Sequence, residues 1–202
     1  RTATLLATED RVLAIFAVAD TIKESSREAI TDLHRLGVTS VMLTGDNVAT
    51  ATSIARQAGI DDARGNLLPE DKLAAIEELQ GRHGPTAMTG DGINDAPALA
   101  RADIGVAMGA AGTDTAMEAA DVVIMNDDLR RIPETIRLSR QTHAVLWQNI
   151  ALALGIKVVF LGLAVFGNAT MWMAVFADMG ASLLVVANGL RTLRTSAPQT
   201  RD

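Results

Sequence analysis

The hydrophobic positions in the first part of the chain form short continuous runs that alternate with segments of helical periodicity. Residues 12–19 form an apolar run that ends at Asp20, a pattern typical of a buried parallel strand. Residues 21–36 follow with apolar positions near one helical face, and Gly37 ends this segment. The pattern predicts further short strands at residues 38–43, 86–89, 104–108 and 122–125, with helices between them. Strands and helices in this order predict an α/β fold with a parallel, doubly wound sheet.

The pattern changes after residue 128. Residues 129–148 have helical periodicity and carry several arginines, and residues 150–166 are then almost wholly apolar. A turn at 167–170 leads into a second apolar span over residues 171–190. Because about twenty apolar residues cross a bilayer, the two spans predict a transmembrane hairpin rather than a buried helical pair of a soluble protein. Arginines flank the outer ends of the hairpin, so both ends are expected to be cytoplasmic.

Composition narrows the classes of function. The net charge is -6 and the basic residues form no stripe, so we expect no binding to nucleic acid. The chain has no cysteine, so it offers neither disulfides nor thiolate ligands, and its three histidines are too widely spaced for a ligand pattern. The chain begins at Arg1 without a signal-peptide pattern, and we expect it to be part of a longer protein.

A Gly-Asp-Gly turn at residues 90–92 follows one of the predicted strands. Glycines on both sides of Asp91 let the backbone turn sharply and approach a ligand closely. Asp91 is thereby predicted at the carboxyl end of a strand, where open α/β sheets bind their ligands. Asn94 and Asp95 follow at offsets that can support this carboxylate or share a hard cation with it. A lone Gly-Asp-Gly would be better explained as a polar turn, so the interpretation depends on motifs upstream.

Two upstream motifs carry groups suited to a phosphate. Thr44 and Gly45 follow the predicted strand 38–43, and their hydroxyl and backbone N–H groups can donate to an anion at a helix amino terminus. Lys72, in Pro-Glu-Asp-Lys, is a compact cation that can hold a phosphate oxygen. Phosphoryl transfer needs positioning and positive charge of this kind. Taken singly, Thr44 is better explained as a helix cap and Lys72 as a solvated lysine; the three motifs together indicate phosphate and Mg²⁺ chemistry.

Thr-Gly-Asp, Pro-Glu-Asp-Lys and Gly-Asp-Gly-Ile-Asn-Asp, in this order, resemble the phosphorylation domain of P-type ATPases. That domain has the haloacid dehalogenase-like fold, and the resemblance covers almost the whole chain. It implies an ATP-dependent ion translocase in which Asp91 and Asp95 serve Mg²⁺, Asp46 lies close to the nucleotide and Asn94 supports the site. It also implies a cytoplasmic phosphorylation domain over residues 1–140, a transmembrane hairpin over 141–194 and a cytoplasmic tail over 195–202.

One component of the family is absent from the sequence. P-type ATPases are phosphorylated on the aspartate of an Asp-Lys-Thr-Gly-Thr string, which does not occur here. The resemblance is therefore to the carboxyl-terminal part of a pump, which alone should be inactive. It implies the rest of the pump as partner, namely the nucleotide-binding and actuator domains and the other transmembrane helices. It also implies an integral membrane protein, in the plasma membrane of a prokaryote, with the α/β domain in the cytoplasm.

Two charged residues interrupt the apolar spans. Lys157 lies ten residues before Gly167, and Asp178 lies ten residues after Asn168. At about 1.5 Å per helical residue, both are predicted near the middle of the bilayer, where an antiparallel hairpin can pair them. An ionisable residue at that depth is a functional candidate, and the alternative is a salt bridge that only locks the hairpin.

A lysine in the first helix and Asp-x-Gly-Ala in the second resemble the zinc-, cadmium- and lead-exporting branch of the heavy-metal P-type ATPases. The Tyr-Asn and Met-Ser features of copper pumps do not occur in these helices. The resemblance implies that Asp178 is a ligand of the transported Zn²⁺, Cd²⁺ or Pb²⁺ and that Lys157 is its counter-ion when the site is empty. The alternatives are a soluble haloacid dehalogenase-like phosphatase and a non-catalytic membrane remnant of a pump.

Overall fold

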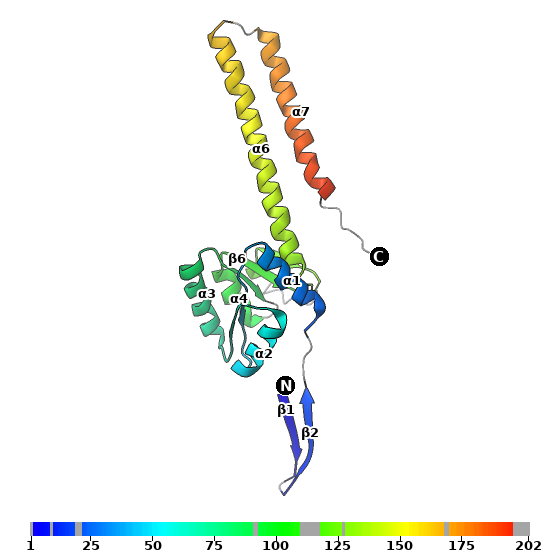
Figure 1. Cartoon of the computed structure of the whole chain (residues 1–202). Coiled ribbons are helices and arrows are strands. Elements are labelled where there is room, and N and C mark those ends of the chain that lie inside the picture. The colour runs from blue at the N-terminus through cyan, green and yellow to red at the C-terminus, as the bar shows by residue number, and fades with distance from the viewer. Residues whose placement is uncertain are drawn as a thin grey trace. The chain divides into compact units, whose positions relative to one another are not determined.

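The computed structural model describes residues 2–8, 10–18, 22–90, 93–109, 118–126, 128–167 and 170–195. The chain divides into two compact units, Arg1–Pro133 and Glu134–Asp202. The first contains β1 (Thr2–Ala7), β2 (Val12–Val18), α1 (Glu24–Arg35), β3 (Val41–Leu43), α2 (Val48–Ala58), β4 (Asp62–Arg64), α3 (Pro69–His83), β5 (Ala87–Gly90), the 3-10 helix η1 (Ile93–Asp95), α4 (Ala96–Arg101), β6 (Ile104–Met108) and β7 (Val122–Ile124) (Figure 1). Helix α6 (Arg131–Val165) begins in the first unit and continues into the second, which also contains α7 (Met171–Thr195).

The strands that follow α1 pair in parallel, as the alternation of strands and helices predicts. Strand β3 pairs with β4, and β5, β6 and β7 form a three-stranded sheet in that order. Helices α2, α3 and α4 lie between the consecutive strands from β3 to β6 (Figure 1), and the α/β prediction is confirmed. Strand β4 was not predicted, because its three residues, Asp62–Arg64, carry only one apolar side chain.

The prediction of a buried parallel strand at residues 12–19 is wrong. This segment forms β2, which pairs with β1 in an antiparallel hairpin. The side chains of Val12, Leu13 and Ile15 are exposed in this unit. An apolar run shows that a strand is suited to burial but not which strand it pairs with, and the short connection from β1 favours an antiparallel neighbour.

Three aspartates have the same role at the amino-terminal edge of the parallel strands. Each stands immediately before one strand and accepts a hydrogen bond from a backbone N–H at or next to the start of the neighbouring strand. The pairs are Asp61 with Ser40, Asp103 with Thr86 and Asp121 with Gly105, all at 2.8 Å. The backbone hydrogen bond lowers the pKa of Asp61 and that of Asp103, because it stabilises the ionised carboxylate. These contacts fix the amino-terminal edge, and the predicted site residues Thr44 and Asp95 follow strands β3 and β5 at the opposite edge.

The core of the first unit lies between α3, α4 and the sheet. Its buried members are Ile76, Met88, Ala98 and Leu99. Helices α3 and α4 therefore share a core with β5, and each begins with a proline in its first turn, where a missing N–H costs nothing. This packing holds the amino-terminal turn of α3 close to the segment that follows β5.

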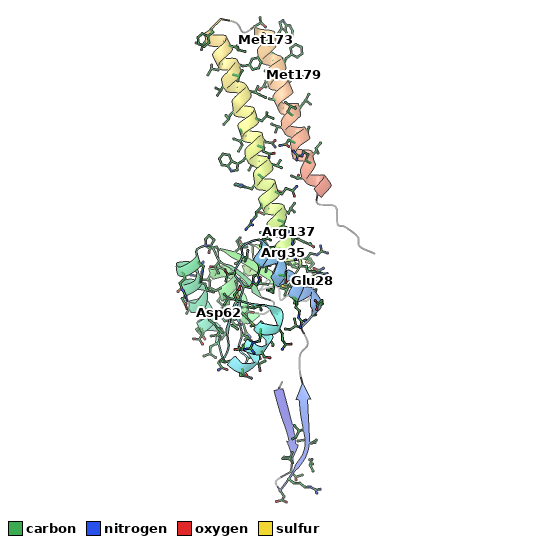
Figure 2. All side chains as sticks on the ribbon, viewed as in Figure 1. Glu28, Arg35, Asp62, Arg137, Met173 and Met179 are labelled. Carbon is green, nitrogen blue, oxygen red and sulfur yellow. The ribbon has the colours of Figure 1, made fainter. Side chains whose placement is uncertain are left out.

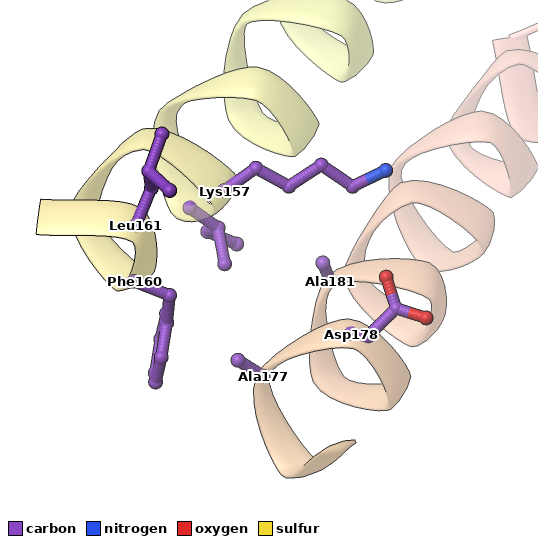
Figure 3. Close-up of a pocket in the computed structure, with 7 residues that line it drawn as sticks. Lys157, Phe160, Leu161, Ala177, Asp178 and Ala181 are labelled. Atoms are coloured by element: carbon purple, nitrogen blue, oxygen red, sulfur yellow. The ribbon is translucent and has the colours of Figure 1, made fainter. Parts of the chain in front are cut away.

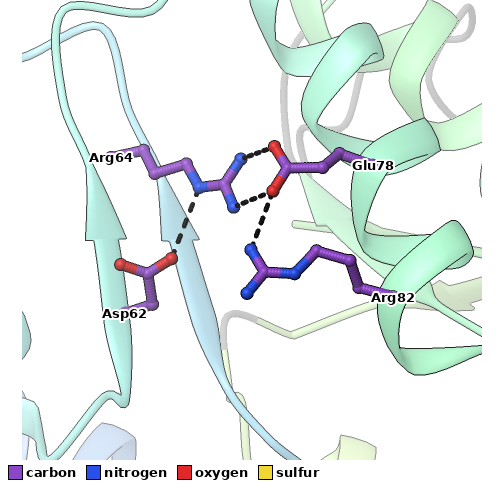
Figure 4. Close-up of polar contacts among 4 residues, drawn as sticks. All are labelled: Asp62, Arg64, Glu78 and Arg82. Atoms are coloured by element: carbon purple, nitrogen blue, oxygen red, sulfur yellow. Dashed lines mark hydrogen bonds and ion pairs between the residues drawn. The ribbon is translucent and has the colours of Figure 1, made fainter.

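An ion-pair cluster fixes α3 to β4 (Figure 4). Arg64 donates two hydrogen bonds to the carboxylate of Glu78, at 2.7 and 3.1 Å, and also bonds Asp62 at 3.3 Å. Arg82 donates to the same carboxylate at 2.9 Å. The Arg64 and Arg82 hydrogen bonds lower the pKa of Glu78 to about 2. A bidentate arginine–carboxylate pair restricts orientation as well as distance, so the cluster sets the direction of α3 relative to β4.

The second unit consists of the helices α6 and α7. Among the described residues, α6 is the one helix that is long and apolar enough to cross a membrane. Helix α7 carries exposed apolar side chains, including Met173 and Met179 (Figure 2). Its role as a second span stays a prediction, as do the predicted boundaries at residues 140 and 194. The predicted turn at 167–170 includes residues 168 and 169, which lie outside the described part of the chain.

Candidate phosphate and cation sites

The Thr44–Asp46 segment forms a tight turn at the carboxyl end of β3. The Thr44 hydroxyl accepts a hydrogen bond from the Asp46 N–H at 3.1 Å and donates to the Asp46 carboxylate at 3.2 Å. The next residue, Asn47, caps α2 by accepting from the Thr50 N–H at 2.8 Å. The cap of this helix is therefore Asn47 and not Thr44, whose hydroxyl bonds Asp46 instead.

The loop after β4 holds this turn in place. Asn66 donates its backbone N–H to the Asp46 carbonyl at 2.6 Å, and Leu67 donates to the Thr44 carbonyl at 3.1 Å. Asn66 has a φ of 57°, a left-handed conformation that is uncommon outside glycine. A Cβ on Gly65 would lie 2.8 Å from backbone atoms of Asp46 and Val48, so the two loops approach too closely for a side chain. Sequence reasoning missed this loop, although the Gly-Asn dipeptide is a turn signal.

Lys72 and Asp95 meet at the carboxyl edge of the sheet. The Lys72 ammonium donates to Asp95 Oδ1 at 2.7 Å, and the two side chains are only 16% and 14% exposed. Lys72 comes from the first turn of α3, and Asp95 ends η1, directly after β5. Asp71 supports the start of α3 by accepting from the Leu68 N–H at 2.9 Å. The structure thus brings two of the predicted site residues together from segments that are far apart in the sequence.

The close approach of Asp95 explains the first glycine of the Gly-Asp-Gly turn. A Cβ on Gly90 would lie 2.9 Å from both the Cβ and Oδ2 of Asp95. Oδ2 of Asp95 therefore lies against the end of β5, while Oδ1 binds Lys72. Asn94 lies on η1 and is exposed. Asp91 and Gly92 lie outside the described residues, so the role of Asp91 stays a prediction.

A Mg²⁺ site of the predicted kind would need few protein ligands. Mg²⁺ is usually bound through one or two carboxylates together with water and substrate phosphate oxygens. The carboxylate of Asp95 suits this chemistry, since Lys72 occupies one of its oxygens and the other lies at the strand end. Within the described ranges, no three His, Cys, Asp or Glu side chains form a group that could hold a metal. Among the described residues, the Asp95 carboxylate suits a metal that takes its other ligands from water and phosphate.

In the second unit, Lys157 of α6 and Asp178 of α7 line the same pocket (Figure 3). The pocket has a volume of about 310 Å³, and its other lining residues are Ile156, Phe160, Leu161, Ala177 and Ala181. The predicted placement at one depth is consistent with this arrangement. Between these two described side chains the structure has no ion pair, so the predicted contact is not formed here. Both side chains are exposed in this unit.

Comparison with known proteins gives a consistent family. The model of the haloacid dehalogenase-like hydrolases matches residues 1–103. The chain is 50% identical over 195 residues to a probable cadmium-transporting ATPase of Alkalihalophilus pseudofirmus, covering 96% of this chain and 27% of that protein. It is 48% identical over 194 residues to the zinc/cadmium/lead-transporting P-type ATPase of Escherichia coli, covering 96% and 26%.

A solved structure agrees with these sequence matches. The crystal structure of a zinc-transporting PIB-type ATPase in the E2.Pi state superposes with a TM-score of 0.86 at 47% identity. The match covers 95% of this chain and 31% of that one. The chain thus spans about a quarter to a third of the length of the proteins it matches. It belongs to the haloacid dehalogenase-like hydrolase family, and its homologues there are cadmium- and zinc-transporting P-type ATPases.

Proposed function

We propose that the chain is part of an ATP-driven pump that exports Zn²⁺, Cd²⁺ or Pb²⁺, and that it supplies phosphate-binding residues and an intramembrane metal ligand. The observation that carries this proposal is the Lys72–Asp95 pair at the carboxyl edge of a parallel sheet. The homologues named for cadmium, zinc and lead transport support the choice of cargo. The rest of the pump and the lipid bilayer are the partners, and we place the α/β unit in the cytoplasm of a prokaryote.

Lys72 is the group best placed to hold a phosphoryl oxygen. Its ammonium is partly buried and bonds one carboxylate oxygen, which leaves two of its three donors for a ligand. Asp95 keeps the lysine side chain oriented before the phosphate arrives, so little ordering is needed at the moment of reaction. The Gly45 N–H donates to the same phosphate, as does the Thr44 hydroxyl once it gives up its hydrogen bond to the Asp46 carboxylate, and Asp46 lies close to the nucleotide.

Mg²⁺ would neutralise charge on the phosphoryl oxygens. Asp91 and Asp95 are the residues that we propose to hold it, with Asn94 in support. Because the Asp95 carboxylate also bonds Lys72, it would contact both the Lys72 ammonium and the proposed Mg²⁺. The aspartate that accepts the phosphoryl group belongs to the part of the pump outside this chain, so the segment alone should not form a phosphoenzyme.

In the membrane, Asp178 offers an oxygen ligand to the transported cation and Lys157 offers a positive charge that can replace the cation after release. A carboxylate oxygen suits Zn²⁺ and its heavier relatives when it is combined with sulfur ligands from other helices. The shared pocket is the observation that supports pairing these two residues in one site.

The test is ATP hydrolysis by the complete pump, purified in detergent and supplied in turn with Zn²⁺, Cd²⁺, Pb²⁺ and Cu⁺. We expect stimulation by the three divalent ions and none by Cu⁺. Hydrolysis of phosphate esters without metal stimulation would support the phosphatase alternative instead. A folded pump with no ATP turnover under any metal would support the non-catalytic alternative.

A further inference from the structure

A cluster of polar side chains joins α6 to α7 outside the proposed cation site. Asn188 of α7 donates its amide Nδ2 to Asn149 Oδ1 at 2.9 Å and to Gln148 Oε1 at 3.3 Å. Arg191, one turn further along α7, donates to Asn188 Oδ1 at 3.1 Å. We call Gln148, Asn149, Asn188 and Arg191 the interhelical amide cluster.

The contact with Arg191 fixes the orientation of the Asn188 amide. Arginine has donors only, so the Asn188 atom that faces it must be the oxygen. The amide nitrogen therefore faces α6, and Asn149 and Gln148 must present oxygens to it. The direction of the hydrogen bond between the helices is thus determined by chemistry.

The cluster and the pocket lie on the same two helix faces. On α6, Ile156 is seven residues after Asn149, which is about two turns along one stripe. On α7, Ala181 is seven residues before Asn188, and it is buried at 6% exposure. One continuous contact surface therefore runs from the amide cluster to the pocket.

The cluster also sets the level at which the two charged residues meet. Lys157 lies eight residues beyond Asn149 on α6, about 12 Å along the helix. Asp178 lies ten residues before Asn188 on α7, about 15 Å along an antiparallel helix. The two levels differ by about 3 Å, which is less than one helical turn. Sliding α7 by one turn would move Asp178 about 5 Å from its present level.

We propose that the interhelical amide cluster is a register lock, which holds α7 against α6 so that Asp178 and Lys157 share one cation site. This inference rests on the proposed role of Asp178 as a ligand. Asn188 and Asn149 are positioning residues in it, since they contact each other and not the cation. Lipid-facing apolar contacts do not fix register, because one apolar residue is replaced by another when a helix slides.

The test uses a matched pair of variants in the complete pump. Asn188→Asp removes the donor but keeps the oxygen that accepts from Arg191, and it places a carboxylate oxygen opposite the amide oxygens of Asn149 and Gln148. Asn149→Asp makes the same chemical change across the contact but keeps the acceptor for Asn188. Both variants add one negative charge at the same level, but Asn188→Asp alone loses the two donations to α6, and its charge lies beside Arg191.

The measurements are the zinc concentration that half-saturates ATP hydrolysis and the KM for ATP. We expect Asn188→Asp to raise the half-saturating zinc concentration about three- to tenfold, the range for interhelical hydrogen bonds in membranes, with no change in the KM for ATP. Asn149→Asp should stay close to the wild type. If Asn188→Asp does not yield folded pump, Asn149→Leu removes the acceptor without adding charge and should give the same rise.

Equal zinc dependence in Asn188→Asp and Asn149→Asp would overturn the register lock, whether both stay at the wild-type value or both rise. Asp178→Ala is measured alongside. Wild-type zinc dependence in that variant would overturn the proposed ligand role of Asp178, and with it this inference. Loss of zinc stimulation in Asp178→Ala, together with wild-type behaviour in Asn188→Asp, would overturn the register lock alone.

Discussion

Lys72 bonds Asp95 across the carboxyl edge of the sheet, with 2.7 Å between the ammonium nitrogen and Oδ1. The lysine lies in the first turn of α3 and the aspartate ends η1, so the pair depends on the packing of α3 and α4 over β5. Both side chains are largely buried, which removes most of the competition from water. A cation held in this way is oriented before its anionic ligand binds, as electrostatic catalysis requires.

The first prediction concerns Lys72. Lys72→Met keeps the helix and most of the side-chain volume but removes the charge, so ATP turnover by the complete pump should fall by about a hundredfold or more. Asp95 then loses its cation, and we expect some loss of stability. The measurement is the rate of ATP hydrolysis, together with the melting temperature of the purified pump.

Two further variants separate catalysis from folding. Lys72→Met with Asp95→Asn removes both charges, so it should regain stability without regaining turnover. Lys23→Met removes an exposed lysine before α1 and should leave turnover unchanged. Wild-type turnover in Lys72→Met would mean that Lys72 is only a structural lysine.

The second prediction concerns the loop that holds the Thr44–Asp46 turn. In Gly65→Ala, the new Cβ would lie 2.8 Å from backbone atoms of Val48 and Asp46, so one of the two loops must move. We expect a cost of about 1–3 kcal/mol in the free energy of unfolding and a higher KM for ATP, because the phosphate-binding turn shifts. Equilibrium unfolding and steady-state kinetics measure the two effects.

Gly81→Ala is the matched control, since a Cβ at Gly81 meets no atom within 4 Å. Gly81 lies inside α3, where alanine stabilises a helix by about 0.5–1 kcal/mol relative to glycine. The two glycine substitutions should therefore change stability in opposite directions. A Gly65→Ala protein as stable as Gly81→Ala would show that the loops are not closely packed.

The third prediction concerns acid stability. The Ser40 N–H, and next the contact with His34, lower the pKa of Asp61 below its value in the unfolded chain. The stabilisation is therefore fully present above about pH 4, the unfolded pKa, and is lost as the pH falls through the folded value. Asp61→Ala should lower the melting temperature at pH 7 and reduce the loss of stability below pH 4.

The melting temperatures of the wild type and the variants, measured between pH 3 and pH 7, test this prediction. Asp10→Ala removes an exposed aspartate between β1 and β2 and is expected to leave the acid dependence unchanged. If the melting temperature of Asp61→Ala fell with acid as much as that of the wild type, other carboxylates would be responsible for the loss of stability at low pH.

The alternation of strands and helices from α1 onward was predictable except for β4, because apolar runs and helical stripes follow directly from burial. The motif residues Thr44, Lys72 and Asp95 were predictable as a set from their residue types and from strand ends. Contacts between residues that are distant in the sequence could not be predicted, because they depend on tertiary packing. Examples are the contact of Asn66 with Asp46, the Arg64–Glu78 pair and the antiparallel pairing of β2. Asn188 was missed because a single amide in an apolar helix carries no signal until its partner helix is placed.

The proposed pump combines phosphate chemistry in the first unit of this chain with a cation ligand, Asp178, in the second. The most direct measurement is Zn²⁺ binding to the detergent-purified complete pump, compared between the wild type and Asp178→Ala. We expect Asp178→Ala to lose the intramembrane zinc site and zinc-stimulated ATP hydrolysis, and Lys157→Ala to retain zinc binding. Wild-type zinc stoichiometry and affinity in Asp178→Ala would contradict this expectation.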